Sequence, residues 1–310
     1  MSVGGVARPA GDAFNGRFFL VSYLPTYAAA VYILVLVWAG APGQDIQFGR
    51  AWKTAAALSG GEILLLAVAI TLGALLLHPL QLALVRIIEG YWPAWLTPLT
   101  RALLRRQRKR HARLANAAQI GSDEEQNPRA ILSAGIASTR LRRLYPAASD
   151  VRPTTLGNVL TAMEGRAGAE YGWDAVVAWP RLYPVLGEQV RAVVDDRRNT
   201  MDAVARLSVV ATMTGLVTVA LLAQSGWWLL LALAPLGVGW LAYRSAVQAA
   251  LAYAEAVDVA FDLHRFDLLK ALHLDMPADQ TAERETAAAL SGLWRQGKPV
   301  RLEYHHDDQK

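Results

Sequence analysis

The sequence predicts an all-α integral membrane protein with four transmembrane helices in two hairpins and a helical cytosolic domain. The strongest observation is a run of 37 residues between Arg206 and Arg244 without one Asp, Glu, Lys or Arg. As a single helix this run would be about 55 Å long, well beyond the ~30 Å hydrocarbon core of a bilayer. A polar turn at 224–226 divides it, which predicts two spans, 207–223 and 227–243. Hydrophobic residues make up 54% of the chain, which is typical of a multi-pass membrane protein.

Two further apolar stretches lie upstream, at 18–38 and 63–85. The first contains no formal charge and is long enough to cross a bilayer. A cleaved signal peptide is the alternative, because small residues follow at 39–41, but the apolar core is longer than such a signal needs. The second stretch lies between Glu62 and Arg86. Both are therefore interpreted as spans, which gives four in all.

The distribution of basic residues predicts the orientation. The segment from Arg86 to Arg206 carries 19 of the 31 Lys and Arg residues, whereas the connection at 39–62 carries only Arg50 and Lys53. The positive-inside rule therefore places the long middle segment and both termini in the cytoplasm. The resulting segments are a cytosolic N-terminus (1–17), a first transmembrane hairpin (18–88), a cytosolic helical insert (89–205), a second hairpin (206–243) and a cytosolic helix with a tail (244–310).

Helices are expected within the insert. Apolar residues and the surrounding loops predict one helix over 130–144 and a second over 158–170. Thr154 or Thr155 is positioned to cap the second helix, because a hydroxyl accepts a hydrogen bond from a free amide of the first turn.

The aromatic stretch 171–184 follows these helices and is broken by prolines. It is either the packed centre of the insert, with Trp173 and Trp179 as anchors, or an amphipathic piece lying on the membrane. Packing is the favoured interpretation. No proline occurs between 186 and 223, so the third span is expected to continue a cytosolic helix. Neither Gly nor Pro occurs between Gly239 and Pro277, so the helix of the fourth span is expected to run from Trp227 past Leu272.

A basic patch follows the second span. Its cations are Arg101, Arg105, Arg106, Arg108, Lys109, Arg110 and Arg113. Binding of RNA or DNA is one interpretation, but no Phe, Tyr or Trp in the patch offers a surface on which bases would stack. The favoured interpretation is attraction to anionic lipid headgroups, at about 1 kcal/mol per cation near the surface.

Polar residues near the cytosolic end of the second span form a candidate path through the membrane. His78 and Gln81 are three residues apart and share a helical face, and Arg86 and Glu89 follow within about two turns. Ionisable residues inside spans commonly mark substrate or ion pathways. The alternative is structural: Arg86 and Glu89 extend to the headgroups while His78 bonds a neighbouring helix.

A second candidate site is an acidic stripe on the last long helix. Glu255, Asp258, Asp262 and Arg265 follow one another at spacings of three, four and three, which places them on one face. This face would either line a vestibule and hold a cation, or be a solvated surface with an Asp262–Arg265 ion pair worth a few tenths of a kcal/mol.

The sequence contains no pattern for catalysis. It lacks a phosphate-binding Gly-rich loop, a Gly-x-Ser-x-Gly elbow and a His-Glu-x-x-His motif. The absence of cysteine excludes thiolate ligands and nucleophiles. The run 305–308 contains His and Asp, but chain ends are poor metal sites. We expect no catalytic residues, no cofactor and no metal site.

Several runs together resemble a family of multi-pass membrane proteins from high-GC actinobacteria. They are 78–81, 85–93, 155–158, 171–175, 179–181 and 260–265. The resemblance covers most of the chain and implies a bacterial plasma membrane protein, but it brings no known activity. The predicted order of spans and insert is also similar to that of bestrophin channels, in architecture only.

These observations favour a non-enzymatic, homo-oligomeric membrane protein that acts as a channel or a pore-like effector. Small residues in the predicted spans suit close helix packing. The alternative is a membrane scaffold whose cytosolic helices bind a protein partner. A membrane enzyme acting on lipid or prenyl substrates is a third, weaker hypothesis. The expected partners are the bilayer, anionic lipid at its cytosolic face and other copies of the chain, with no nucleic acid.

Overall fold

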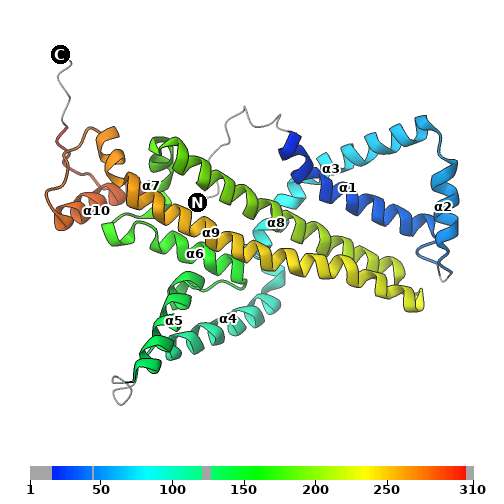
Figure 1. Cartoon of the computed structure of the whole chain (residues 1–310), viewed down its shortest axis with the longest axis horizontal. Coiled ribbons are helices and arrows are strands. Elements are labelled where there is room, and N and C mark those ends of the chain that lie inside the picture. The colour runs from blue at the N-terminus through cyan, green and yellow to red at the C-terminus, as the bar shows by residue number, and fades with distance from the viewer. Residues whose placement is uncertain (1–15, 44, 121–126, 305–310) are drawn as a thin grey trace. The chain divides into compact units, whose positions relative to one another are not determined.

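The computed structural model describes residues 16–43, 45–120 and 127–304, without the side chains of 16–23, 77–82 and 84. All its named elements are helical, and the one isolated β-bridge in these residues joins Leu274 to Tyr304 (Figure 1). The α-helices are α1 (Gly16–Trp38), α2 (Phe48–Ala57), α3 (Gly60–Ile88), α4 (Thr97–Ala117), α5 (Pro128–Leu144), α6 (Thr155–Arg166), α7 (Ala175–Leu182), α8 (Glu188–Leu222), α9 (Leu233–Ala271) and α10 (Gln280–Gln296). Short 3-10 segments are η3 (Ala94–Leu96), η5 (Ala148–Asp150), η6 (Ala169–Tyr171), η7 (Tyr183–Val185) and η8 (Gly226–Ala232). The predicted all-helical fold is confirmed.

Two helical segments among the described residues are long and apolar enough to cross a membrane, Glu188–Leu222 and Gly226–Ala271. The helices Phe48–Ala57 and Gly60–Leu76 pass the same test only when they are taken together as one broken span, and a bend of 110° separates them. The described apolar part of α1, Leu24–Trp38, is shorter. The structure thus gives two to three candidate spans, and the predicted four are not confirmed.

The connection expected at 39–62 contains a helix, α2, that the sequence interpretation missed. The following helix starts with a capping box: the amide of Ser59 donates to the carboxylate of Glu62 at 2.7 Å, and the Glu62 amide donates to the Ser59 hydroxyl at 3.4 Å. This reciprocal pair satisfies two amides that a helix start leaves free. Gly60 and Gly61 are therefore the first residues of α3.

The chain divides into two compact units. Among the described residues, unit 1 contains 89–120, 127–199 and 247–304, and unit 2 contains 16–43, 45–88 and 200–246. Each unit is described separately below, on its described residues.

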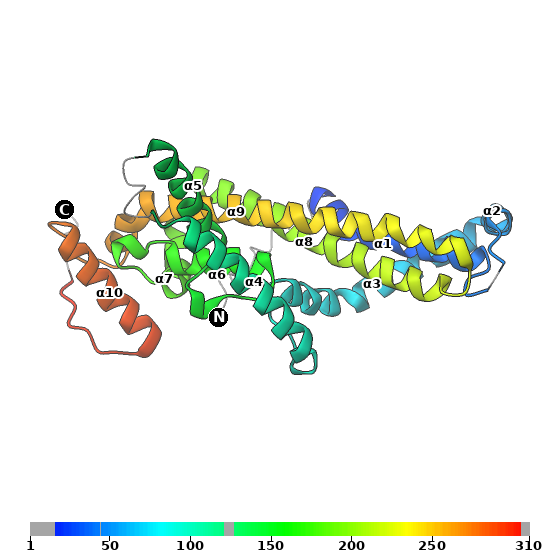
Figure 2. The same ribbon diagram turned by 90° about the horizontal axis from the view of Figure 1, so that it is seen from below.

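In unit 2, α8 and α9 run side by side (Figure 2) and approach closely at glycine. The Ser208 hydroxyl donates to the carbonyl of Gly239 at 3.0 Å. A Cβ at Gly239 would lie 3.0 Å from the amide nitrogen of Thr212, and one at Gly215 would overlap the side chain of Leu236. Small residues allow such close backbone contact, which is how helices associate in a membrane.

An apolar cluster in unit 2 joins the end of α1 to α2 and to the turn between α8 and α9. Leu36 and Leu222 are fully buried in it, and Trp228 packs against them. Two polar bonds reinforce this packing: the Tyr32 hydroxyl donates to the carbonyl of Leu231 at 2.9 Å, and the Ser225 hydroxyl donates to that of Gly43 at 2.7 Å. The cluster therefore ties the first two helices to the second hairpin.

The core of unit 1 forms around aromatic residues of the insert. Trp179 and Phe261 are 1% exposed, and their ring centroids lie 6.1 Å apart. Trp173 is 3% exposed and stacks on Trp294 of α10 at 5.9 Å. The favoured interpretation of 171–184 as the packed centre of the insert is therefore confirmed.

The start of α6 is fixed by polar bonds. The Thr154 hydroxyl accepts from the Gly157 amide at 3.1 Å, so Thr154 is the cap. Asn158 is completely buried; its side chain accepts from the Arg152 amide at 2.7 Å and donates to the carbonyls of Arg152 and Thr154 at 3.0 and 2.8 Å. Because each polar atom of this amide has a partner, its burial carries no large desolvation penalty.

Candidate functional site

The acidic residues of α9 form a charged seam in unit 1, which we define as Glu255, Asp258, Asp262, Arg265 and their partners. Glu255 pairs with Arg143 of α5 at 3.2 Å, and Asp258 pairs with Arg166 of α6 at 2.7 Å. Each carboxylate thus faces a cation from a different helix of the insert. Two of the three carboxylates of the stripe are therefore already paired with cations, which makes them poorer cation ligands, and the vestibule or cation interpretation stays a prediction.

The second half of the seam corrects the expected Asp262–Arg265 pair. The Arg265 guanidinium bonds the carboxylate of Glu283 in α10 at 2.7 Å and the backbone carbonyl of Asp262. The carboxylate of Asp262 instead accepts from the Tyr171 hydroxyl at 2.9 Å. Helical spacing places these two side chains on one face, but each has its side-chain partner on another element, on η6 for Asp262 and on α10 for Arg265.

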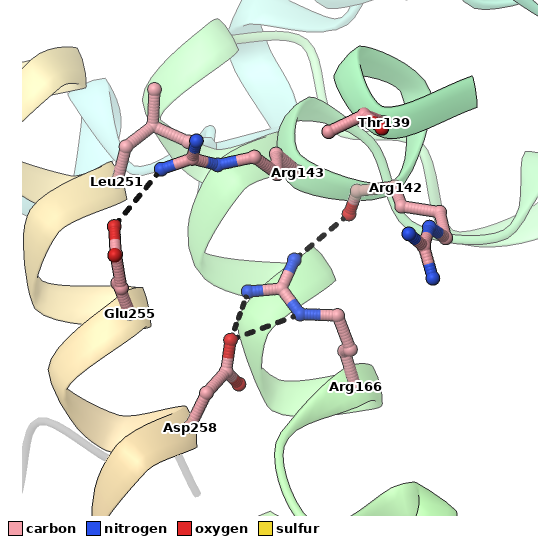
Figure 3. Close-up of a pocket in the computed structure, with 7 residues that line it drawn as sticks. All are labelled: Thr139, Arg142, Arg143, Arg166, Leu251, Glu255 and Asp258. Atoms are coloured by element: carbon pink, nitrogen blue, oxygen red, sulfur yellow. Dashed lines mark hydrogen bonds and ion pairs between the residues drawn. The ribbon is translucent and has the colours of Figure 1, made fainter. Parts of the chain in front are cut away.

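Arg166 and Asp258 form the centre of the seam (Figure 3). Nε and Nη2 of Arg166 both donate to Oδ2 of Asp258, at 3.2 and 2.7 Å, while Nη1 donates to the carbonyl of Arg142 at 3.0 Å. The other carboxylate oxygen, Oδ1, is buried without a hydrogen-bond partner among the described residues. Burial raises the pKa of Asp258 above its usual range, although the Arg166 guanidinium opposes that change.

A cavity of about 260 Å³ opens beside this pair. It is lined by Thr139, Arg142, Arg143, Arg166, Leu251, Glu255 and Asp258. The guanidinium of Arg142 has no ion-pair or hydrogen-bond partner among the described residues, and Figure 3 shows it apart from the bonded groups. The lining therefore has three cations and two carboxylates, and both carboxylates are paired.

The candidate path residues of the second span are only partly described. The backbone at His78 and Gln81 is helical within α3, but their side chains lie outside the described residues. Arg86 is exposed at the end of α3, and Glu89 is half-buried just beyond it. The polar path therefore stays a prediction, because the structure does not describe the side chains of His78 and Gln81.

The basic patch lies on α4, and all seven of its cations are exposed to solvent. The helix is held by one buried polar residue, Gln107, whose amide nitrogen donates to the Thr155 hydroxyl at 3.1 Å and whose carbonyl accepts from the Tyr145 hydroxyl at 2.9 Å. The ring of His111 contacts that of Tyr145 edge-on at 5.6 Å. Sequence reasoning missed Gln107, although a lone amide among seven cations was a usable signal.

Sequence reasoning also missed the partners of the seam. Arg143, Arg166 and Tyr171 lie 112, 92 and 91 residues from the groups they bind. No periodicity within a helix carries such pairing information. The only local signal was the excess of arginine at the end of α5.

The geometry defines an all-helical protein with helices that can cross a membrane. In unit 1, a charged seam joins α9 to helices of the insert and to α10. Comparisons with protein-family models, curated proteins and solved structures give no match to this chain. Among the described residues no group of three or more His, Cys, Asp or Glu is arranged to hold a metal ion. The His and Asp residues at 305–308 lie outside that description.

Proposed function

We propose that this chain is a four-span protein of the bacterial plasma membrane, with both termini in the cytoplasm, that assembles as a homo-oligomer and forms a pore-like conduction path. One observation carries the proposal: only 39% of the apolar window of the α8 segment and 17% of that of the α9 segment are buried within the chain. The remaining apolar surface needs lipid or other copies to cover it.

The exposed apolar surface of α9 in unit 2 is suited to contact with lipid and with other copies of the chain. Leu233, Trp240 and Leu241 are 63%, 56% and 58% exposed. An apolar surface of this kind suits acyl chains, and a ring of copies would cover part of it while enclosing a central axis. A conduction path shared between chains needs such an axis.

The path would take its polar groups from α3. On α8, Thr214 and Thr218 are buried and donate to their own helix, to the carbonyls of Val210 and Thr214 at 2.8 Å each. These hydroxyls are satisfied within the chain and do not favour α8 as the lining. His78 and Gln81 share one face of α3, and this placement supports α3 as the lining helix.

Native mass spectrometry of the purified protein in nanodiscs tests the assembly. A ring of four or more copies is the expected result, because it provides the axis that a shared pore needs. A monomer or dimer would contradict conduction and would favour the scaffold hypothesis, in which the helices of the insert bind a cytosolic protein.

Ion flux into liposomes tests the path itself. His78→Leu and Gln81→Leu should each change the flux, because an apolar side chain removes a polar contact from the lining. Ala83→Leu is the matched control, since residue 83 is exposed and lies about 200° around the same helix from residue 81. Parent-like flux in both test variants would remove α3 as the lining.

A further inference from the structure

We propose that the hairpin formed by α4 and α5 is a surface anchor for anionic lipid, with the α4 cations at the headgroups and an apolar ridge of α5 embedded among them. The inference rests on the proposed membrane function, because a membrane must lie within reach of the hairpin. It assigns a lipid-binding role to α5, which the sequence did not indicate.

Charge is the first observation. The 21 residues of α4 include seven cations and no carboxylate, and the 17 residues of α5 include four cations and no carboxylate. None of the α4 cations has a carboxylate partner among the described residues. Arg101, Arg105 and Arg108 share one face at spacings of four and three, so a planar array of phosphates can meet them together.

The ridge on α5 is the second observation. Leu132 and Ile136 are 66% and 50% exposed and lie one turn apart, and Ile131 beside them is 46% exposed. The buried residues of α5, Ala134 and Ala137, lie on roughly the opposite side of the helix. A cationic helix packed beside a helix with an exposed apolar ridge is the combination that binds a membrane surface.

The charges also decide between possible occupants of this surface. A second copy would bring an equally cationic hairpin against the first, and the two would repel each other. An acidic protein would match the cations, but lipid is favoured because the hairpin follows α3 closely in the chain. Trp95, 77% exposed between α3 and α4, is a side chain of the type that settles at a lipid–water interface.

The experiment uses the full chain, whose natural lack of cysteine allows single labels. Nitroxides are placed at Leu132→Cys and Ile136→Cys, with Ala278→Cys as an exposed control in unit 1 and Leu241→Cys as a control in the predicted fourth span. Each protein is reconstituted in nanodiscs of phosphatidylcholine alone or with phosphatidylglycerol. The measurement is the collision rate of the nitroxide with oxygen, which favours lipid, and with a water-soluble nickel chelate.

With phosphatidylglycerol, labels at 132 and 136 should show more oxygen contact and severalfold less nickel contact than the label at 278. The difference should shrink at high salt, because the Debye length falls from about 10 Å at 0.1 M to about 3 Å at 1 M. It should also shrink when Arg101, Arg105 and Arg108 are all replaced by Gln.

Three results would overturn the proposal. Nickel contact at 132 and 136 equal to that at 278 in both lipids would show a hairpin in water. Spin–spin broadening between copies at these positions would assign the ridge to an interface between chains, and immobilisation only after addition of an acidic polypeptide would assign it to a protein partner. If the label at 241 collides mainly with oxygen and the label at 132 mainly with the nickel chelate, the surface anchor alone is refuted. If the label at 241 collides mainly with the nickel chelate, the proposed membrane function is refuted as well.

Discussion

Two glycines of α6 lie in contrasting surroundings and predict opposite responses to the same substitution. A Cβ at Gly157 would overlap the carbonyl oxygen of Glu89, whereas Gly165 has no heavy atom within 4 Å of that position. Gly157→Ala should therefore lower the free energy of unfolding by about 1–3 kcal/mol through overpacking. Gly165→Ala should raise it by up to about 1 kcal/mol, because alanine favours the helix.

Thermal unfolding of both variants in mild detergent, followed by circular dichroism, checks this prediction. Gly165→Ala is the matched control, since helix propensity alone makes the two substitutions equivalent. An equal gain in stability at both positions would mean that α6 does not pack on the Glu89 carbonyl.

Tyr183 predicts a change at alkaline pH. Its hydroxyl donates to Asp195 at 2.6 Å, and burial first, then this bond and the Asp195 charge, raise its pKa from 10.0 to about 12. A phenol whose pKa is higher in the folded state stabilises that state fully below pH 10, and the contribution is lost as the pH rises toward 12. Absorbance titration should show late-ionising tyrosine that Tyr183→Phe reduces. Unchanged late ionisation in that variant would contradict the assignment.

At the residue scale, the sequence more often indicated that a residue has a structural role than which partner it contacts. Thr154 as a cap and Trp179 as an anchor follow from local chemistry, because a cap acts within one turn and a large aromatic seeks burial. The partner of Asp258 did not follow, since Arg166 reaches it only after α6 has folded onto α9. For the same reason, the sequence did not predict that Arg265 pairs with Glu283 and not with Asp262.

At the scale of elements, the seam contains ion pairs that differ in exposure and therefore in their contribution to the free energy of unfolding. Arg265 and Glu283 are 18% and 7% exposed, whereas Arg143 and Glu255 are 49% and 71% exposed. Removing one partner of the enclosed pair leaves a buried charge, at a cost of about 3–5 kcal/mol. An exposed pair contributes only about 0.2–1 kcal/mol.

Arg265→Ala should therefore loosen α10 from α9, while Arg143→Ala should leave it in place. Hydrogen exchange read by mass spectrometry measures this directly: amides of 280–296 should exchange faster in Arg265→Ala and at the parent rate in Arg143→Ala. Equal protection of α10 in all three proteins would mean that the aromatic stack of Trp173 on Trp294 holds this helix without the ion pair.

Helices with a long, uninterrupted pattern were predictable from the sequence. The absence of proline over 186–223 predicted one helix, and α8 covers Glu188–Leu222. The fourth span was expected to start as a helix at Trp227, but a 3-10 segment occupies Gly226–Ala232 first. Helix α2 was missed because its ten residues are too short and too mixed in character to give a strong pattern.

At the scale of the whole molecule, the structure confirms helices that can cross a membrane but gives only two to three candidate spans among the described residues, so the predicted four remain a prediction. Composition marks the stretch 63–85 as a span, whereas Gly60–Leu76 of α3 is a candidate span only together with α2, across a bend of 110°. Hydropathy reports the preference of a segment for lipid and not the path that its ends take. The four-span topology therefore needs an experiment that places individual residues on one side of the membrane.

The absence of cysteine makes that experiment direct. Single cysteines at Ser2, Asp45 and Arg108 are treated in intact cells with a maleimide that cannot cross the membrane. Four spans place only residue 45 outside, so only Asp45→Cys should react before lysis, and all three should react after it. If the pair of α2 and α3 forms one span beside α8 and α9, residue 2 lies outside as well and Ser2→Cys also reacts. If only α8 and α9 cross, residues 45 and 108 lie on the same side and react alike. Each pattern corresponds to one span count, and only the first agrees with the positive-inside distribution together with an N-terminus in the cytoplasm.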